Sequence, residues 1–176
     1  MNGLNLPVST FTLVSQDTSP EGGKPVSLIE DEHPVINFDK VADEHAKNLD
    51  YKKFESNDAL FLEGEEKIPW FIEFKNGDIK LKELRQKACA SLLIAMHLVI
   101  IKDLKDAQTR ANYILVYNPD YTCKHRERLT QHALRPSSTP YLQPKVKSFS
   151  WLFKSAFSYT PEEFRTHFLA KQYKQK

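Results

Sequence analysis

The fold of this 176-residue chain is decided by two short stretches, SNDALFL at 56–62 and WFIEFKNG at 70–77. Both are rich in apolar and aromatic residues, and the polar, turn-prone segment 63–69 separates them, so they predict adjacent strands of a hairpin. Asp58 opens the first strand and Glu73 interrupts the second. Because side chains alternate between the two faces of a strand, Glu73 and Lys75 share one face. Lys and Glu are seldom buried unless they are paired or bound to a metal, so this gathering of charges indicates a functional site.

The tripeptide Glu73-Phe74-Lys75, placed after an acid at the start of the preceding strand and before a long helix, resembles the core motif of the PD-(D/E)XK phosphodiesterase superfamily. That superfamily includes restriction endonucleases, repair and recombination nucleases, and small bacterial, phage and mobile-element proteins. The resemblance covers residues 35–117. Asn57 stands where the family has the proline of its name. The resemblance implies an α/β fold with a restriction-endonuclease-like core, in which a central mixed β-sheet is flanked by helices.

The same resemblance implies a metal site. Asp58, Glu73 and the backbone carbonyl of Phe74 would hold Mg²⁺ or Mn²⁺, because hard oxygen ligands suit these ions. Lys75 would orient the attacking water or help to deprotonate it. Some family members take a further metal ligand from the helix before the sheet, for which Glu44 is the candidate, although an exposed helical Glu is the commoner explanation.

The segment after the hairpin has the longest helical pattern of the chain. Asn76-Gly77 forms a turn, and the apolar residues from Leu81 to Ile100 then follow helical spacing up to about 103–105. Some exonuclease branches of the superfamily carry a Gln on this helix, so Gln86 or Lys87 would lean toward the scissile phosphate. For Gln86, a solvent-exposed helix face is an equal alternative.

Other patterns complete the predicted core. Residues 33–39 predict a strand, 40–54 a helix, and 112–117 a buried strand that is reached by a crossover, so the sheet is expected to be mixed. Residues 1–30 predict a loosely held arm or an edge strand, and residues 31–176 a single domain with a basic, helical C-terminal region.

The C-terminal segment offers two interpretations. Phe149, Phe153 and Phe157 repeat every fourth residue, which favours a helix packed on the core, while the lysines among them are compatible with a surface on which bases stack. Thr160-Pro161-Glu162-Glu163 predicts a helix start with a capping box.

The net charge of +2 conceals an asymmetry. Residues 1–120 hold 14 Lys and Arg against 20 Asp and Glu, and residues 121–176 hold 11 against 3, so the two parts carry −6 and +8. A basic helix in 121–135 is expected to bind a polyanion, although a merely solubilising surface fits the charges equally well. The candidate contacts in the basic C-terminal part are Lys124, Arg126, Arg128 and Lys147.

Several classes of protein are excluded by what the sequence lacks. Its apolar runs are shorter than the ~20 residues of a membrane span, and its N-terminus has no secretory signal pattern, which predicts a cytoplasmic protein. Five glycines form no phosphate-binding loop, and neither GxSxG nor HExxH occurs.

We therefore expect a metal-dependent nuclease, with DNA favoured over RNA as its substrate. Two alternatives stay open. In one, the fold cleaves nothing and acts as a binding or inhibitory module with a protein partner, in a mobile-element, phage-defence or toxin-immunity setting. In the other, Glu73 and Lys75 form an ordinary ion pair on a solvent-facing sheet.

Overall fold

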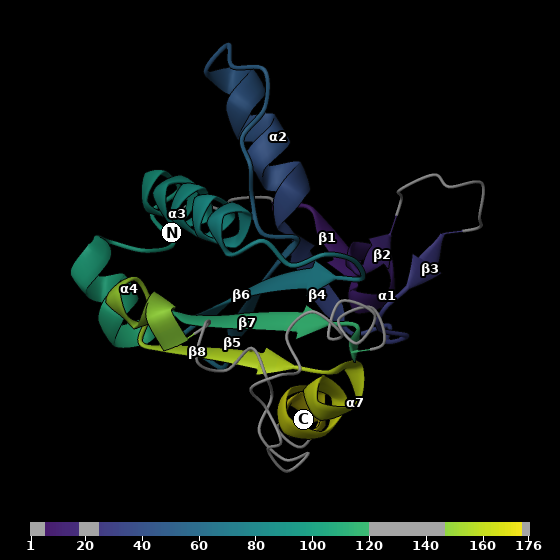
Figure 1. Cartoon of the computed structure of the whole chain (residues 1–176). Helices are drawn as coiled ribbons and strands as arrows, with labels where there is room; N and C mark the ends of the chain where they lie inside the picture. Colours follow the sequence, from purple (N-terminus) through teal and green to yellow (C-terminus); the bar gives the residue numbers. More distant parts are fainter. Residues whose placement is uncertain (1–5, 18–24, 120–146, 174–176) are drawn as a thin grey trace, which may run out of the picture.

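The computed structural model describes residues 6–17, 25–119 and 147–173, and a six-stranded sheet lies at its centre (Figure 1). The strand order is β1-β4-β5-β6-β7-β8, with antiparallel pairing from β1 to β6 and parallel pairing from β6 to β8. The predicted mixed sheet is therefore confirmed. The strands are β1 (Val8–Thr10), β4 (Pro34–Asn37), β5 (Ala59–Glu63), β6 (Ile68–Lys75), β7 (Asn112–Tyr117) and β8 (Ser155–Tyr159), and a separate pair is formed by β2 (Gln16–Asp17) and β3 (Val26–Ser27).

Helices cover both faces of this sheet, so the α/β class is confirmed as well. Figure 1 shows α3 on one side and α7, near the C-terminus, on the other, and Ala107 of α4 belongs to the same apolar cluster as α3. In the described part of the chain, no helix has both the length and the apolar character needed to cross a membrane. The helical elements are α1 (Phe11–Val14), α2 (Phe38–Asn48), α3 (Leu81–His97), α4 (Leu104–Arg110), the 3₁₀ turn η3 (Lys147–Trp151), α7 (Pro161–Phe164), the π-helical turn η4 (Arg165–Leu169) and α8 (Ala170–Gln172).

Two apolar clusters hold the layers together. Phe71 and Tyr113 point to the face covered by α2, α3 and α4, where Leu84 of α3 packs with them. Their neighbours along the strands point to the other face, where Ile72 and Phe164 belong to the second cluster. This alternation follows from the pleat of β6 and β7, which are buried on both sides of the sheet.

The hairpin of β5 and β6, the long helix α3 and the strand β7 lie where the sequence predicts them. The strand predicted at 33–39 stops earlier, at Asn37, because the Asn37 side chain accepts a hydrogen bond from the Lys40 N–H and so caps α2. Asp39 consequently lies in the first turn of a helix. The helix predicted for 40–54 ends at Asn48, and α3 ends at His97 before a second helix, α4, begins.

The helix predicted from Phe149, Phe153 and Phe157 is wrong. Phe149 lies in η3, the chain then turns, and Phe157 lies in β8, so Phe153 packs in the first cluster and Phe157 against the second. Equal spacing of aromatic residues does not exclude a turn of the chain between them. The capping box of Thr160 and Glu163 at the start of α7 is confirmed.

The N-terminal residues that the structure describes contribute β1, which pairs with β4 at the edge of the sheet. Phe11 of α1 follows directly and is fully buried in the second cluster. The basic helix predicted for 121–135 lies outside the described residues.

Candidate functional site

Three segments of the chain meet where the strands β4 and β6 end and the strand β5 begins. β4 and β6 run in one direction and β5 in the other, so the ends of β4 and β6 lie beside the start of β5. There Asn37 pairs with Ala59, and the Phe38 N–H donates to the Asp58 carbonyl at 3.0 Å. Acidic residues that follow β4, precede β5 and end β6 therefore meet in one place.

Glu73 is the centre of this meeting point and is fully buried. Its Oε1 lies 2.8 Å from the Nζ atom of Lys87 and 3.3 Å from that of Lys75. Its Oε2 accepts a hydrogen bond from the side-chain amide of Asn57 at 3.2 Å. Because Glu73 is inaccessible to solvent, the alternative of an ordinary ion pair on a solvent-facing sheet does not describe this site.

Asp58 lies beside Glu73 with 16% of its side chain exposed. Its Oδ2 accepts the Phe74 N–H at 2.6 Å, and its Oδ1 lies 3.5 Å from the Lys87 Nζ. Burial, followed by the negative charge of Glu73, raises the pKa of Asp58 well above its ordinary value, although Lys87 and the Phe74 N–H act in the opposite direction. The protein therefore holds this carboxylate where its ionised form is disfavoured.

Lys87 extends from α3 and bridges the two carboxylates. Burial alone would lower the pKa of its ammonium, but the charges of Glu73 and Asp58 outweigh burial and raise that pKa. Ser91, four residues later and thus on the same helix face, accepts the Asn57 N–H at 2.8 Å. α3 is therefore tied to the start of β5 by a salt bridge and by a buried hydrogen bond.

The charged cluster forms part of the wall of a hollow of about 540 Å³. Glu73 does not line the hollow itself, whereas Lys75 and Lys87, which both contact it, do. Five aspartates and three lysines line the hollow, so its wall has a net negative charge. The lining residues are Leu13, Val14, Ser15, Gln16, Asp17, Asn37, Asp39, Lys40, Asp43, Asp58, Phe74, Lys75, Asn76, Gly77, Asp78 and Lys87.

The structure thus brings together four of the residues singled out in the sequence, namely Asp58, Glu73, Lys75 and Lys87. The resemblance implied that Lys87 would lean toward the scissile phosphate. In the structure its ammonium instead lies between the carboxylates of Asp58 and Glu73.

Other candidate residues lie elsewhere. Glu44 is exposed on α2 and does not line the hollow, although its neighbour Asp43 does. Gln86 is exposed on α3 beside Lys87. Lys124, Arg126 and Arg128 lie outside the described residues, and so does the side chain of Lys147 at the start of η3.

Two residues of the site were missed. Asp39 lines the hollow and accepts a hydrogen bond from the Ser56 hydroxyl. The preference of Asn for the N-cap would have placed it, since a helix that starts after Asn37 carries Asp39 in its first turn. Asn57, the fully buried partner of Glu73, stands where the resembled family has its proline, and nothing in the sequence gives it a role in the site.

Metal binding at this site depends on the donors that it offers. Within the described ranges, no three His, Cys, Asp or Glu side chains are grouped closely enough to hold a metal ion by themselves. Mg²⁺ needs only one or two carboxylates when water and substrate phosphate complete its shell. Asp58 and Glu73 meet that requirement as a donor set, provided that Lys87 leaves the position between them.

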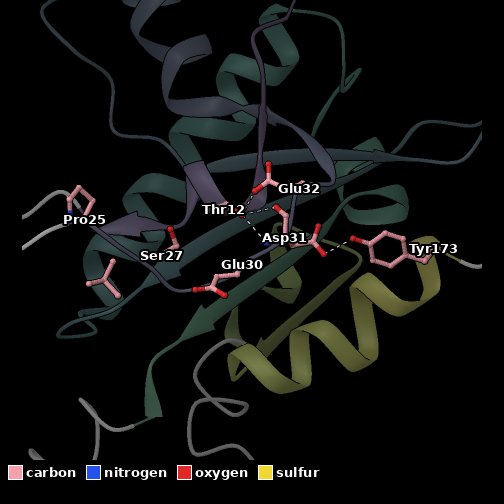
Figure 2. Close-up of a pocket in the computed structure, with 8 residues that line it drawn as sticks. Thr12, Pro25, Ser27, Glu30, Asp31, Glu32 and Tyr173 are labelled. Carbon is pink, nitrogen blue, oxygen red and sulfur yellow. Dashed lines mark hydrogen bonds between the residues drawn. The ribbon is translucent and has the colours of Figure 1, made fainter.

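A second hollow, of about 750 Å³, contains none of these residues (Figure 2). Two of its three carboxylates already have partners, since Asp31 accepts the Tyr173 hydroxyl and Glu32 accepts the Thr12 hydroxyl, and the third is Glu30. These bonds connect the N-terminal segment to the last helical turn, so they account for this acidic surface structurally.

No family model matches the chain, and comparison with curated proteins and with solved structures found no match either. The chemistry of the site therefore has to be derived from its own geometry.

Proposed function

We propose that this protein is a metal-dependent nuclease that hydrolyses phosphodiester bonds, with DNA favoured over RNA. The observation that supports the proposal is the convergence of Asp58, Glu73 and Lys75 beside one hollow at the end of the sheet. Buried, mutually perturbing charges at a concave surface are characteristic of catalytic sites.

Asp58 and Glu73 would hold the Mg²⁺ or Mn²⁺ ion together with the Phe74 carbonyl. The Phe74 N–H is directed at Asp58, and the N–H and C=O of one residue point to the same side of an antiparallel strand. We therefore expect the Phe74 carbonyl to face the carboxylates as well. When bound, the ion would neutralise charge on the phosphate and favour ionisation of water at neutral pH.

The two lysines would carry out the remaining tasks. Lys75 contacts Glu73 and lines the hollow with 21% of its side chain exposed, so it can orient the attacking water while Glu73 holds its ammonium. Lys87 also reaches the hollow. If a cation were bound between the carboxylates, Lys87 would hold a phosphate oxygen and so place a further positive charge against the developing negative charge.

Cleavage of labelled oligonucleotides in Mg²⁺ tests this function. Lys75→Ala should reduce the cleavage rate by ~10²-fold or more, because a positioned electrostatic or acid–base group is removed. Lys82→Ala removes an exposed lysine five residues before Lys87 and should leave the rate unchanged. Wild-type cleavage by the Lys75→Ala variant, purified free of contaminating nuclease, would remove Lys75 from the mechanism.

A second function is favoured by one specific contact. Lys87 lies between both carboxylates and Lys75 contacts Glu73, so two lysines balance the two carboxylates without a metal ion. A fold of this kind can serve as a binding or inhibitory module that cleaves nothing. Such a protein would show no Mg²⁺-stimulated cleavage of single-stranded, duplex or branched substrates, in contrast to the nuclease.

A further inference from the structure

Four aromatic rings lie in a row at the far end of α2. Tyr51 stacks on Phe54 with ring centroids 5.3 Å apart and an interplanar angle of 12°. Phe54 lies 5.8 Å from His45, and His45 lies 4.6 Å from His97 at the end of α3. We call Tyr51, Phe54, His45 and His97 the ring ladder.

The ring ladder is a surface feature. Tyr51 is 65% exposed at one end and His97 is exposed at the other, whereas Phe54 and His45 are half-buried between them. Burial of a large aromatic side chain usually stabilises a fold. Because most of Tyr51 is exposed to water, its ring contributes little to the stability of this protein.

Lysines and acids both flank the ladder along the chain. Lys47, Lys52 and Lys53 are exposed within positions 47–53, where Asp50 is the one acid, and directly beside His45 and Phe54 the exposed acids are Glu44 and Glu55. Lysines next to open aromatic faces are complementary to a single nucleic-acid strand, because the ammonium groups attract phosphates and the rings stack on bases. A duplex keeps its bases stacked inside and offers only its phosphates.

The ladder is also connected to the proposed active site. The first turns of α2 line the hollow through Asp39 and Asp43, and α2 then stands away from the sheet and ends at the ladder (Figure 1). Eleven helical residues span about 16 Å. That length matches about five nucleotides at the ~3.4 Å spacing of a stacked strand.

We propose that the ring ladder binds the bases of a single-stranded nucleic acid whose backbone continues along α2 to the hollow. This inference rests on the proposed nuclease function, since it names the form of the substrate. It assigns binding to Tyr51 and its neighbouring lysines and assigns no part of the chemistry to them.

Fluorescence anisotropy with a labelled 12-nucleotide single strand, measured in EDTA so that nothing is cleaved, tests the proposal. Tyr51→Ala should weaken binding about fivefold or more, as the loss of a stacked base does. Tyr51→Trp should retain the affinity. Trp151→Ala removes an exposed aromatic residue of η3, outside the ladder, and should change nothing.

Charge reversal provides an independent measurement. Lys52→Glu with Lys53→Glu should reduce the slope of log affinity against log salt, by ~0.7 for each phosphate of a single strand that the protein no longer neutralises. Lys154→Glu with Lys171→Glu makes the same charge change on exposed residues elsewhere and should affect binding less.

Equal affinity of the wild type and Tyr51→Ala would overturn the proposal, and so would an equal reduction in affinity for duplex and single strand. Absence of single-strand binding in the wild type would overturn it as well. A failure of the proposed nuclease function is a different result, because binding in EDTA would then persist while Mg²⁺ produced no cleavage.

Discussion

Asp58 and Asp106 are similarly inaccessible aspartates with opposite electrostatic environments. Their side chains are 16% and 21% exposed, and each lies near a basic residue of a helix. The hydrogen bond from Arg110, which follows one turn later on α4, lowers the pKa of Asp106. Burial and Glu73 raise the pKa of Asp58. Asp106 stabilises the fold by being ionised, whereas ionised Asp58 is maintained at a cost, which is expected of a group retained for function.

Removal of the Lys87 ammonium should change the stability of the protein more than any other substitution that tests this comparison. Lys87→Met would leave Asp58 and Glu73 buried without their shared cation, so the free energy of unfolding in urea should fall by about 3–5 kcal/mol. Arg110→Met, in the more exposed pair, should cost about 1 kcal/mol. Equal decreases would show that the two pairs serve the same structural purpose.

Asp→Asn substitution should change the stability of the protein by a smaller amount, and in opposite directions at the two aspartates. The raised pKa of Asp58 means that its contribution to stability is present below the ordinary value of 3.8 and is lost as pH rises through the folded-state pKa. Asp58→Asn should therefore be more stable than the wild type at neutral pH, by about 1 kcal/mol, with the gain vanishing toward pH 4.

Asp106 should behave in the opposite way. Its lowered pKa gives stability above 3.8 that is lost as pH falls through the folded-state pKa. Asp106→Asn should be less stable at neutral pH by up to about 1 kcal/mol, and this difference should vanish in acid. Urea unfolding of both variants from pH 3 to pH 8 measures these changes in the free energy of unfolding. If the two substitutions changed stability in the same direction at neutral pH, the opposite environments of Asp58 and Asp106 would be contradicted.

The sequence allowed the centre of the site to be predicted, since local patterns determine it. The two-residue period of a strand places Glu73 and Lys75 on one face, and hairpin pairing brings Asp58 next to them. The placement of Lys87 between the carboxylates depends on how α3 packs over β5 and β6, which is a tertiary contact without a local signal.

Other parts of the structure could not be predicted for physical reasons that individual residues illustrate. Asp39 reaches the hollow because the Asn37 cap ends β4, whereas the alternating pattern of apolar and polar residues continues beyond that point. Phe153 and Phe157 pack on opposite faces of the sheet because the chain turns between them, and the Lys154 N–H then bonds to the Ala111 carbonyl at 2.8 Å. Equal spacing of aromatic residues does not encode such a turn.

The most direct test of the central claim is the melting temperature in Mg²⁺ or Mn²⁺. If Asp58 and Glu73 hold the ion, a tenfold excess over its dissociation constant should stabilise the wild type by about 1.4 kcal/mol, which raises its melting temperature by about 3–6 °C. Asp58→Asn should abolish this rise, whereas Asp106→Asn, the same substitution outside the site, should retain it. A wild-type protein that does not respond to either ion, or an Asp58→Asn variant that responds fully, would contradict a metal site formed by these carboxylates.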